Sequence, residues 1–184
     1  MVRICAGQFK GKVIKTQGQV RPTENKVRQA IFNVLGDFIL DARVIDGFAG
    51  SGALGFEALS RGAAFVAFIE SDTEAVLAIR ENLELFSEEL SRENYQVLHL
   101  DVERGIKSLA ESKQPFDLVM LDPPYRSDEA KKALNAVVEY AILAPAGIVV
   151  VEHHQRTVLP MSIGPVQQLK QHRYGDTVLS FYQR

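Results

Sequence analysis

Between a short apolar run and an amphipathic stretch lies the sequence Asp46-Gly47-Phe48-Ala49-Gly50-Ser51-Gly52-Ala53-Leu54-Gly55. Glycines in such a loop let the backbone turn sharply and pass close to a ligand, where a Cβ atom would collide. The start of the following helix directs unpaired backbone N–H groups toward the same ligand. The stretch therefore predicts that a nucleoside-containing cofactor binds at a strand-to-helix turn.

Strand and helix patterns continue to alternate around and beyond this loop. Apolar runs typical of buried parallel strands lie at 44–45, 65–69, 97–100, 116–121 and 148–151. Stretches with helical spacing lie between them, at 53–61, 73–86, 102–112 and 128–143. Two further strand patterns, 166–174 and 177–182, are joined by a turn at Gly175-Asp176. We predict an α/β fold with a Rossmann-like, doubly wound, mostly parallel sheet that ends in an antiparallel hairpin.

The first 36 residues follow a different pattern. Two short strand candidates, 2–5 and 12–15, precede a helix that Pro22 introduces and for which Thr23 is the expected N-cap. This segment carries seven basic side chains against one acidic, a net charge of +6, whereas the other 148 residues carry 14 basic and 22 acidic, a net charge of −8. We predict that residues 1–36 form a basic β-hairpin and helix that contact phosphate, and that residues 37–184 form the catalytic domain. A basic surface that is merely solvated explains the charge equally well.

Composition excludes several other classes of protein. The chain is 46% hydrophobic and 24% charged, as in a soluble globular domain, and no apolar run reaches the roughly 20 residues that span a bilayer. Cys5 is the only cysteine, which favours a reducing cytoplasm. The four histidines show no metal-ligand spacing, so we expect no metal, and we expect His153 and His154 to lie in an exposed turn.

The glycine loop is compatible with two cofactors. Gly50, Gly52 and Gly55 also satisfy the dinucleotide pattern G-x-G-x-x-G, which alone is weak evidence. Glu70 ends the next strand and is placed to accept hydrogen bonds from ribose hydroxyls in either case. Asp46 favours S-adenosylmethionine, because a carboxylate there suits the ammonium group of a methionine moiety, directly or through water, and would repel a pyrophosphate.

Predicted cofactor contacts extend to the third strand. Asp101 ends that strand, where its carboxylate could accept from an adenine amino group while Val102 packs on the ring. Asp101 could also be only the N-cap of the helix that follows. In the loop itself, the predicted cofactor-binding residues beside Asp46 are Phe48, Ala49, Gly50, Ser51 and Gly52.

The strand at 116–121 ends in Asp122-Pro123-Pro124-Tyr125. Two consecutive prolines fix φ and supply no N–H, so the carbonyls around them can accept hydrogen bonds from a ligand. The exocyclic amine of guanine or adenine is a poor nucleophile because its lone pair is delocalised into the ring. Asp122 and the Pro123 carbonyl can each accept one N–H and so direct that lone pair at a methyl group, while Tyr125 stacks on the base. We predict methyl transfer to a base amine, with Asp122, Pro123 and Tyr125 as the catalytic residues.

With these motifs the chain resembles the class I methyltransferases, and more narrowly the bacterial small-subunit (16S) ribosomal RNA guanine-N2 methyltransferases of the RsmD type. The resemblance covers nearly the whole chain and rests on Gly7-Gln8-Phe9-Lys10-Gly11-Lys12, Arg21-Pro22-Thr23, Val27-Arg28, Phe32-Asn33, the loop 48–55 and residues 122–125. It implies an S-adenosylmethionine-dependent enzyme, with S-adenosylhomocysteine as product, that methylates N2 of one guanine in 16S ribosomal RNA. The expected substrate is the assembled or partly assembled small subunit, and we expect a monomer.

Contacts outside the two motifs are predicted from the resemblance and from charge. The resemblance implies that Thr23 borders both the cofactor and the target base. The substrate-binding residues that we predict are Lys10, Lys12, Arg21, Arg28 and Pro124.

Four other functions stay open at this point. The same chemistry serves an adenine-N6 methyltransferase, although this chain has little room for a large target-recognition domain. A protein glutamine methyltransferase would more often have Asn before Pro-Pro-Tyr. An NAD-dependent oxidoreductase requires Asp122 to Tyr125 to be incidental, and a non-catalytic RNA-binding protein leaves a complete methyl-transfer pocket without a use.

Overall fold

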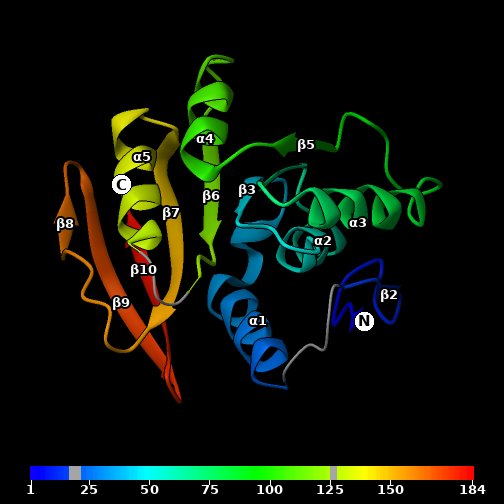
Figure 1. Ribbon diagram of the computed structural model, residues 1–184, viewed down its shortest axis with the longest axis horizontal. Coiled ribbons are helices and arrows are strands. Elements are labelled where there is room, and N and C mark those ends of the chain that lie inside the picture. Colours follow the sequence, from blue (N-terminus) through cyan, green and yellow to red (C-terminus); the bar gives the residue numbers. More distant parts are fainter. Residues whose placement is uncertain (17–21, 125–127) are drawn as a thin grey trace.

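A central sheet organises the protein (Figure 1), and the computed structural model describes residues 1–16, 22–124 and 128–184, with only the backbone described for 22–24. The sheet has eight strands in the order β5-β4-β3-β6-β7-β10-β9-β8. Their bounds are β3 Arg43–Gly47, β4 Phe65–Glu70, β5 Tyr95–His99, β6 Phe116–Leu121, β7 Leu143–His154, β8 Ser162–Ile163, β9 Val166–Tyr174 and β10 Thr177–Gln183. The strands from β5 to β7 run parallel, and β10, β9 and β8 continue the sheet antiparallel.

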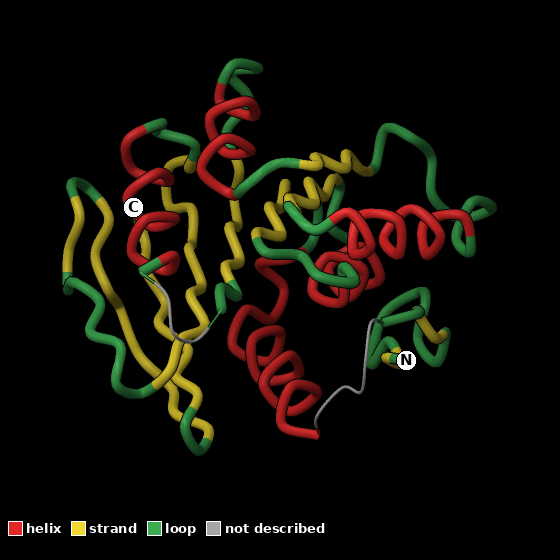
Figure 2. The backbone as a smooth tube through the Cα atoms, in the orientation of Figure 1, coloured by secondary structure: helices red, strands yellow, loops and turns green. Residues whose placement is uncertain are grey.

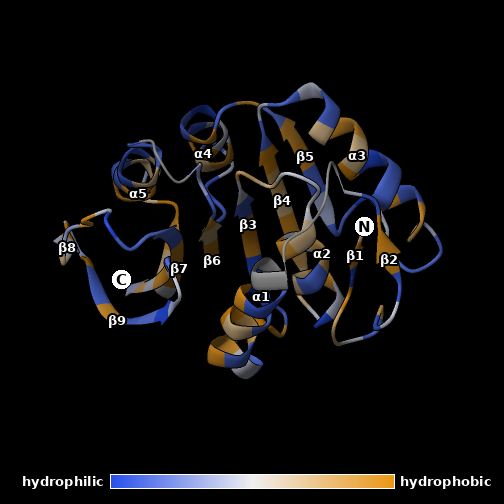
Figure 3. Cartoon of the chain, turned by 60° about the horizontal axis from the view of Figure 1, so that its bottom comes forward, coloured by the Kyte–Doolittle hydropathy of each residue, from blue (hydrophilic) through white to orange (hydrophobic). Residues whose placement is uncertain are grey.

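Helices cover both faces of this sheet. They are α1 Pro22–Leu35, α2 Ala53–Ser60, α3 Thr73–Glu84, α4 Val102–Ala110 and α5 Glu129–Glu139, with a short 3-10 helix, η1, at Gly36–Ile39. Residues of α1, α2 and α3 share one apolar core with side chains such as Val44 and Phe68, whereas α4 and α5 share a second core with Ile45 and Val119. Figure 3 shows the parallel strand β4 in the orange of apolar residues and the antiparallel strand β9 mostly blue. The predicted Rossmann-like, doubly wound fold with its C-terminal hairpin is confirmed.

The N-terminal hairpin is a small separate sheet. Its strands β1 (Val2–Arg3) and β2 (Val13–Ile14) pair antiparallel, and most of residues 1–16 are loop (Figure 2). The side chains of Phe9 and Ile14 are nevertheless fully enclosed in the core under α1, α2 and α3. The hairpin and the helix after it are as predicted, while the division into two domains at residue 36 stays a prediction.

Tertiary pairing shifts several predicted boundaries. The helix predicted to 143 ends at Glu139, because Ala141 takes a left-handed conformation (φ 47°) and Leu143 pairs with Phe116 of β6. The next strand is consequently longer than predicted and runs through His154. His153 is therefore buried at 4% exposure rather than placed in an exposed turn, and its ring nitrogen Nε2 lies 2.8 Å from Ser180 Oγ.

The start of α1 also differs from its prediction. The helix begins at Pro22, so Thr23 falls in its first turn and is not the N-cap. The Thr23 side chain and all of Arg21 lie outside the described part of the chain, so their predicted contacts with cofactor, base or phosphate stay predictions. Among the described residues, no helix combines the length and apolar character that crossing a membrane requires.

Candidate active site

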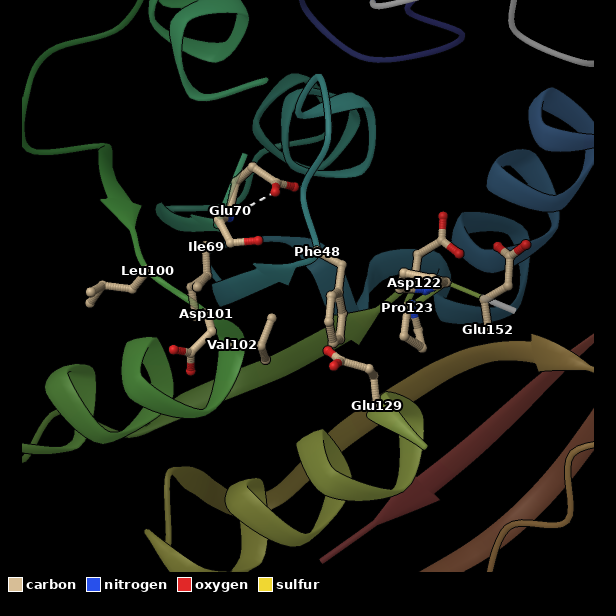
Figure 4. A pocket seen from close by; sticks show the side chains of 12 residues that line it. Phe48, Ile69, Glu70, Leu100, Asp101, Val102, Asp122, Pro123, Glu129 and Glu152 are labelled. Carbon is tan, nitrogen blue, oxygen red and sulfur yellow. Dashed lines mark hydrogen bonds between the residues drawn. The ribbon is translucent and has the colours of Figure 1, made fainter. Parts of the chain in front are cut away.

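A cavity of about 590 Å³ opens at the carboxyl ends of the parallel strands (Figure 4). This edge is where open α/β sheets bind their ligands. Seven of the predicted site residues line the cavity, namely Phe48, Glu70, Asp101, Val102, Asp122, Pro123 and Pro124. Five lining residues were not predicted, namely Ile69, Ser71, Leu100, Glu129 and Glu152. The sheet therefore brings the two sequence motifs into one cavity.

The cavity has two ends, with the ring of Phe48 between them (Figure 4). The glycine-loop end is formed by the ends of β4 and β5 and the start of α4, with Ile69, Glu70, Ser71, Leu100, Asp101 and Val102. The Pro-Pro end is formed by the ends of β6 and β7, with Asp122, Pro123, Pro124 and Glu152.

The loop after β3 turns through left-handed backbone conformations. Phe48, Gly50 and Gly52 have φ of 63°, 54° and 80°, which only glycine adopts without strain. A Cβ atom on Gly52 would also lie 2.9 Å from a ring carbon of Phe56, so the glycine is required twice over. Phe48 alone among the predicted loop residues lines the cavity; Ala49, Gly50, Ser51 and Gly52 do not. Their contact with a cofactor stays a prediction.

Glu70 holds this loop in place. One carboxylate oxygen accepts the Gly50 N–H at 2.7 Å, and the other accepts the N–H groups of Ser71 and Asp72 at 2.7 and 2.8 Å. A carboxylate has about four acceptor positions, so three bonds fix the side chain and leave capacity for one more donor. This arrangement suits the predicted ribose contact, which remains untested.

Asp46 lies beneath the loop and does not reach the cavity wall. It is 1% exposed, and its Oδ2 accepts the Gly55 N–H at 2.8 Å at the start of α2. Burial raises the pKa of Asp46 to about 8, the Gly55 hydrogen bond opposes this rise, and the nearby charge of Glu70 adds to it. The predicted contact with an ammonium group, direct or through water, stays a prediction.

Asp101 is the N-cap that the sequence offered as one of two interpretations, while its predicted contact with adenine stays a prediction. Its Oδ1 accepts the Arg104 N–H at 2.9 Å and so caps α4, while the side chain also lines the cavity. Val102 is 5% exposed and presents an apolar surface beside it. The second oxygen, Oδ2, lies 3.3 Å from Arg104 Nε. A carboxylate has about four acceptor positions, so it can also accept from a ligand.

The Pro-Pro end continues β6 past its last residue. The Asp122 N–H donates to the Gly47 carbonyl at 3.3 Å, which holds the residue against the neighbouring strand. The Asp122 side chain is exposed, and the ring of Pro123 is buried. Tyr125 lies outside the described residues, so its predicted stacking stays a prediction.

Glu152 and Glu129 reach the cavity from elements that carry no recognisable motif. Leu121 pairs in register with Val151, so Asp122 and Glu152 are the next residues on adjacent parallel strands. Glu152 is 7% exposed, whereas Glu129 is exposed at the start of α5. A lone Glu at the end of an apolar strand gives no signal by itself, although its place one residue beyond the fifth strand could have indicated the same edge as Asp122.

The N-terminal hairpin is anchored by a buried carboxylate that the sequence did not reveal. Glu57 of α2 is 1% exposed and accepts the backbone N–H groups of Cys5 and Ala6 at 2.9 and 3.1 Å. The Arg28 guanidinium lies against it, with Nε 3.7 Å from Glu57 Oε2, and donates to the Arg3 carbonyl at 2.9 Å. Arg28 is only 5% exposed, so the prediction that it contacts phosphate is wrong; it positions the hairpin instead.

Asn82 connects the hairpin to the glycine loop. This side chain of α3 is fully buried, accepts the Lys15 N–H at 2.8 Å and donates to the Lys15 carbonyl at 2.9 Å. The same amide nitrogen lies 3.3 Å from the Ser51 carbonyl, to which it also donates. One amide therefore fixes the end of β2 relative to the loop at the cavity.

The two predicted hairpin lysines differ in their surroundings. Lys10 is exposed at the turn of the hairpin. Lys12 forms an ion pair with Glu89, and its ammonium lies 5.1 Å from the centre of the Phe86 ring. Their contact with RNA is untested. Within the described residues there is also no cluster of His, Cys, Asp and Glu that could hold a metal ion.

Comparisons with known proteins identify the family of the chain. Residues 2–183 match the family model described as "Conserved hypothetical protein 95". The chain is 35% identical over 185 residues to "Putative rRNA methyltransferase YlbH" of Bacillus subtilis, covering 100% of this chain and 99% of that protein. It is 32% identical over 185 residues to "Ribosomal RNA small subunit methyltransferase D" of Escherichia coli K12, covering 100% of this chain and 90% of that protein.

Solved structures give the same result. The Escherichia coli protein called "Putative methyltransferase yhhF" superposes with a TM-score of 0.86 at 32% identity, covering 100% of this chain and 97% of that one. The Thermus thermophilus 16S rRNA N2 G1207 methyltransferase, solved with AdoMet and guanosine, has a TM-score of 0.72 at 25% identity, covering 100% of this chain and 49% of that one. The chain therefore belongs to the family described as Conserved hypothetical protein 95, which confirms its resemblance to the RsmD-type methyltransferases.

Proposed function

We propose that this protein transfers a methyl group from S-adenosylmethionine to the exocyclic N2 amine of one guanine in the 16S ribosomal RNA of the small subunit. The observation that carries the proposal is that one cavity is lined by Asp122 and Pro123 on one side of the Phe48 ring and by Glu70 and Asp101 on the other. A cofactor end and an acceptor end in one cavity are what group transfer between two bound molecules requires.

The residues at the glycine-loop end fit S-adenosylmethionine. The fixed carboxylate of Glu70 can accept from a ribose hydroxyl, and Asp101 and Val102 provide an acceptor and an apolar surface for adenine. Asp46, buried beneath the loop, is our proposed partner for the ammonium group, directly or through water. When bound, this cofactor supplies an activated methyl group on a sulfonium. Solved relatives support the choice, since the Thermus enzyme was crystallised with AdoMet.

The Pro-Pro end would prepare the amine. The Asp122 carboxylate and the Pro123 carbonyl each accept one N–H of the amine, which turns its lone pair toward the methyl group. The new N–C bond forms as the S–C bond breaks, and the surplus proton leaves the nitrogen afterward. Tyr125 is proposed to stack on the base. Positioning supplies most of the catalysis, so no separate general base is needed.

The choice of guanine and of 16S RNA rests on relatives. The name of the Escherichia coli relative specifies the small-subunit ribosomal RNA, and the Thermus structure contains guanosine and is named for N2 methylation. These names support an S-adenosylmethionine-dependent rRNA methyltransferase, and guanine N2 is our proposal within that class. We further propose that the exposed Lys10 contacts phosphate and that the enzyme acts on the small subunit or an assembly intermediate.

Labelled methyl transfer to small subunits that lack their guanine-N2 methylation tests the proposal. One labelled N2-methylguanine, mapped in 16S RNA, is the expected product. Label in adenine or in ribosomal protein would overturn the acceptor assignment while keeping the methyltransferase. A thermal-shift comparison in which NAD stabilises the protein and S-adenosylmethionine does not would overturn the cofactor as well.

A further inference from the structure

A second carboxylate accompanies Asp122 at the acceptor end. Glu152 occupies the register position next to Asp122, because Leu121 and Val151 are paired on the parallel strands β6 and β7. Residues in register on parallel strands direct their side chains to the same face of the sheet. Figure 4 shows both carboxylates on the same side of Phe48, away from Glu70 and Asp101.

Glu152 is also enclosed, in contrast to its neighbour. Its partner on β10 is Leu179, a member of the core that α1 and α2 cover, and Glu152 itself is 7% exposed while lining the cavity. A carboxylate that loses water on folding requires donors from protein or ligand in exchange. Asp122, on the open side, is exposed. A ligand that enters this end therefore meets two adjacent groups that accept hydrogen bonds.

One edge of guanine carries two hydrogen-bond donors that match these two acceptors. Its N2 amine and its N1–H are neighbouring donors, whereas the ring N1 of adenine or 2-aminopurine is an acceptor. We infer that Glu152 accepts the N1–H of the target guanine while Asp122 accepts an N2–H, which makes Glu152 the residue that selects guanine. The inference rests on the proposed function, since it assigns a partner to a base already placed beside Asp122. A ring that offers an acceptor at N1 would place its lone pair against those of Glu152, and two acceptors in contact repel each other.

The test replaces the target guanine by 2-aminopurine, which keeps the 2-amino group but has no N1–H. Small subunits are reconstituted with RNA that carries either base at the mapped position, and kcat/KM is measured for both. The wild-type enzyme should prefer guanine by about 10²-fold or more, because a site built around a donor rejects the analogue that lacks it. Glu152→Gln can offer an amide N–H to the acceptor N1 of 2-aminopurine. The ratio of kcat/KM for guanine to kcat/KM for 2-aminopurine should therefore fall at least about tenfold.

Control variants separate base selection from a structural role. Glu152→Ala removes both acceptor oxygens and should also narrow the preference, mainly by lowering kcat/KM for guanine. Glu139→Gln neutralises an exposed carboxylate at the end of α5 and should leave the preference unchanged. Melting temperature and the dissociation constant for S-adenosylmethionine report on folding, and both should stay near wild type in Glu152→Gln.

The outcomes separate a failure of the proposed methyl transfer from a failure of the role assigned to Glu152. If wild-type enzyme makes no N2-methylguanine, the proposed function fails before Glu152 is considered. If wild-type enzyme methylates guanine and Glu152→Gln keeps the full preference over 2-aminopurine, only the role of Glu152 is overturned. A variant that loses activity on both bases in equal proportion, with cofactor affinity intact, also overturns base selection and leaves Glu152 as a structural residue.

Discussion

At the glycine-loop end of the cavity, backbone N–H groups from nearby in the chain hold the side chains, whereas at the Pro-Pro end strand pairing brings distant residues together. Glu70 accepts three backbone N–H groups, two of them from the next two residues, and Asp101 caps the helix that it precedes. Asp122 and Glu152 are 30 positions apart and meet through the register of β6 and β7. The first end is prearranged by local geometry, and the second depends on the sheet.

This difference predicts that the two ends fail in different ways. Damage at the glycine-loop end should weaken cofactor binding, and damage at the Pro-Pro end should slow methyl transfer with the cofactor still bound. Variants at each end, measured for both quantities, can establish or refute the division.

The largest effect is expected for Asp122→Ala. The variant should lose about 10²- to 10³-fold or more in kcat, because one preorganised polar group at the reacting amine is removed. Its dissociation constant for S-adenosylmethionine, measured by calorimetry, should change less than about twofold, or about 0.4 kcal/mol. Asp122 lies at the acceptor end of the cavity and is not expected to contact the cofactor's ribose or adenine. Asp37→Ala, at an exposed carboxylate in η1, provides the control and should match wild type in both. Wild-type turnover by Asp122→Ala would contradict the mechanism.

Glu70→Gln should produce the opposite result. Its amide NH2 group must face either the Gly50 N–H or the N–H groups of Ser71 and Asp72, so at least one bond is lost. We expect the dissociation constant for S-adenosylmethionine to rise about tenfold, the equivalent of one hydrogen bond, with kcat at saturation near wild type. Calorimetry and saturation kinetics measure the two. Glu74→Gln, exposed in the first turn of α3, is the matched control. A variant with unchanged affinity and lowered kcat would remove the division between the two ends.

The same difference explains what the sequence could predict. Two motifs of the site are each an unbroken stretch of sequence, Asp46 to Gly55 and Asp122 to Pro124. Their chemistry and their place at strand ends could therefore be predicted directly from the sequence. Glu152 escaped notice because its meaning depends on a strand pairing that no local pattern encodes. Arg28 was misplaced for the same reason, since only the packed fold shows Glu57 beside it. The boundary between α5 and β7 shifted because residues 142–143 fit either a helix or a strand until β6 pairs with them.

A smaller effect is expected on the RNA-binding surface, where the two hairpin lysines can be compared. Lys10→Gln should weaken RNA binding severalfold and reduce the slope of log affinity against log salt by about 0.7 to 1, if one phosphate contact is lost. Lys12→Gln should have less effect, because the Lys12 ammonium already pairs with Glu89. Filter binding of 16S RNA across a salt series measures both. Equal slopes in wild type and Lys10→Gln would remove the hairpin turn from the RNA contacts.

The buried carboxyl under the glycine loop should affect stability rather than catalysis. Because burial raises the pKa of Asp46 to about 8, the folded protein keeps a proton there that the unfolded chain releases near pH 4. The folded state therefore binds more protons between these values, and the contribution of Asp46 to stability is complete below pH 4 and lost as the pH rises to about 8. Asp46→Asn keeps an acceptor for the Gly55 N–H and cannot titrate.

Without cofactor, Asp46→Asn should therefore become more stable relative to wild type as the pH rises from 5 to 8. The difference between their free energies of unfolding in urea should grow by about 3 to 4 kcal/mol across this range, because each pH unit between the two pKa values is worth about 1.4 kcal/mol. Subtracting wild type from variant cancels other titrating groups, including His153, whose pKa burial lowers. A difference that stays constant with pH would show an ionised Asp46 throughout. The glycine-loop end would then be held by a buried charge rather than by a neutral hydrogen bond, and its prearrangement would resemble that of Glu70.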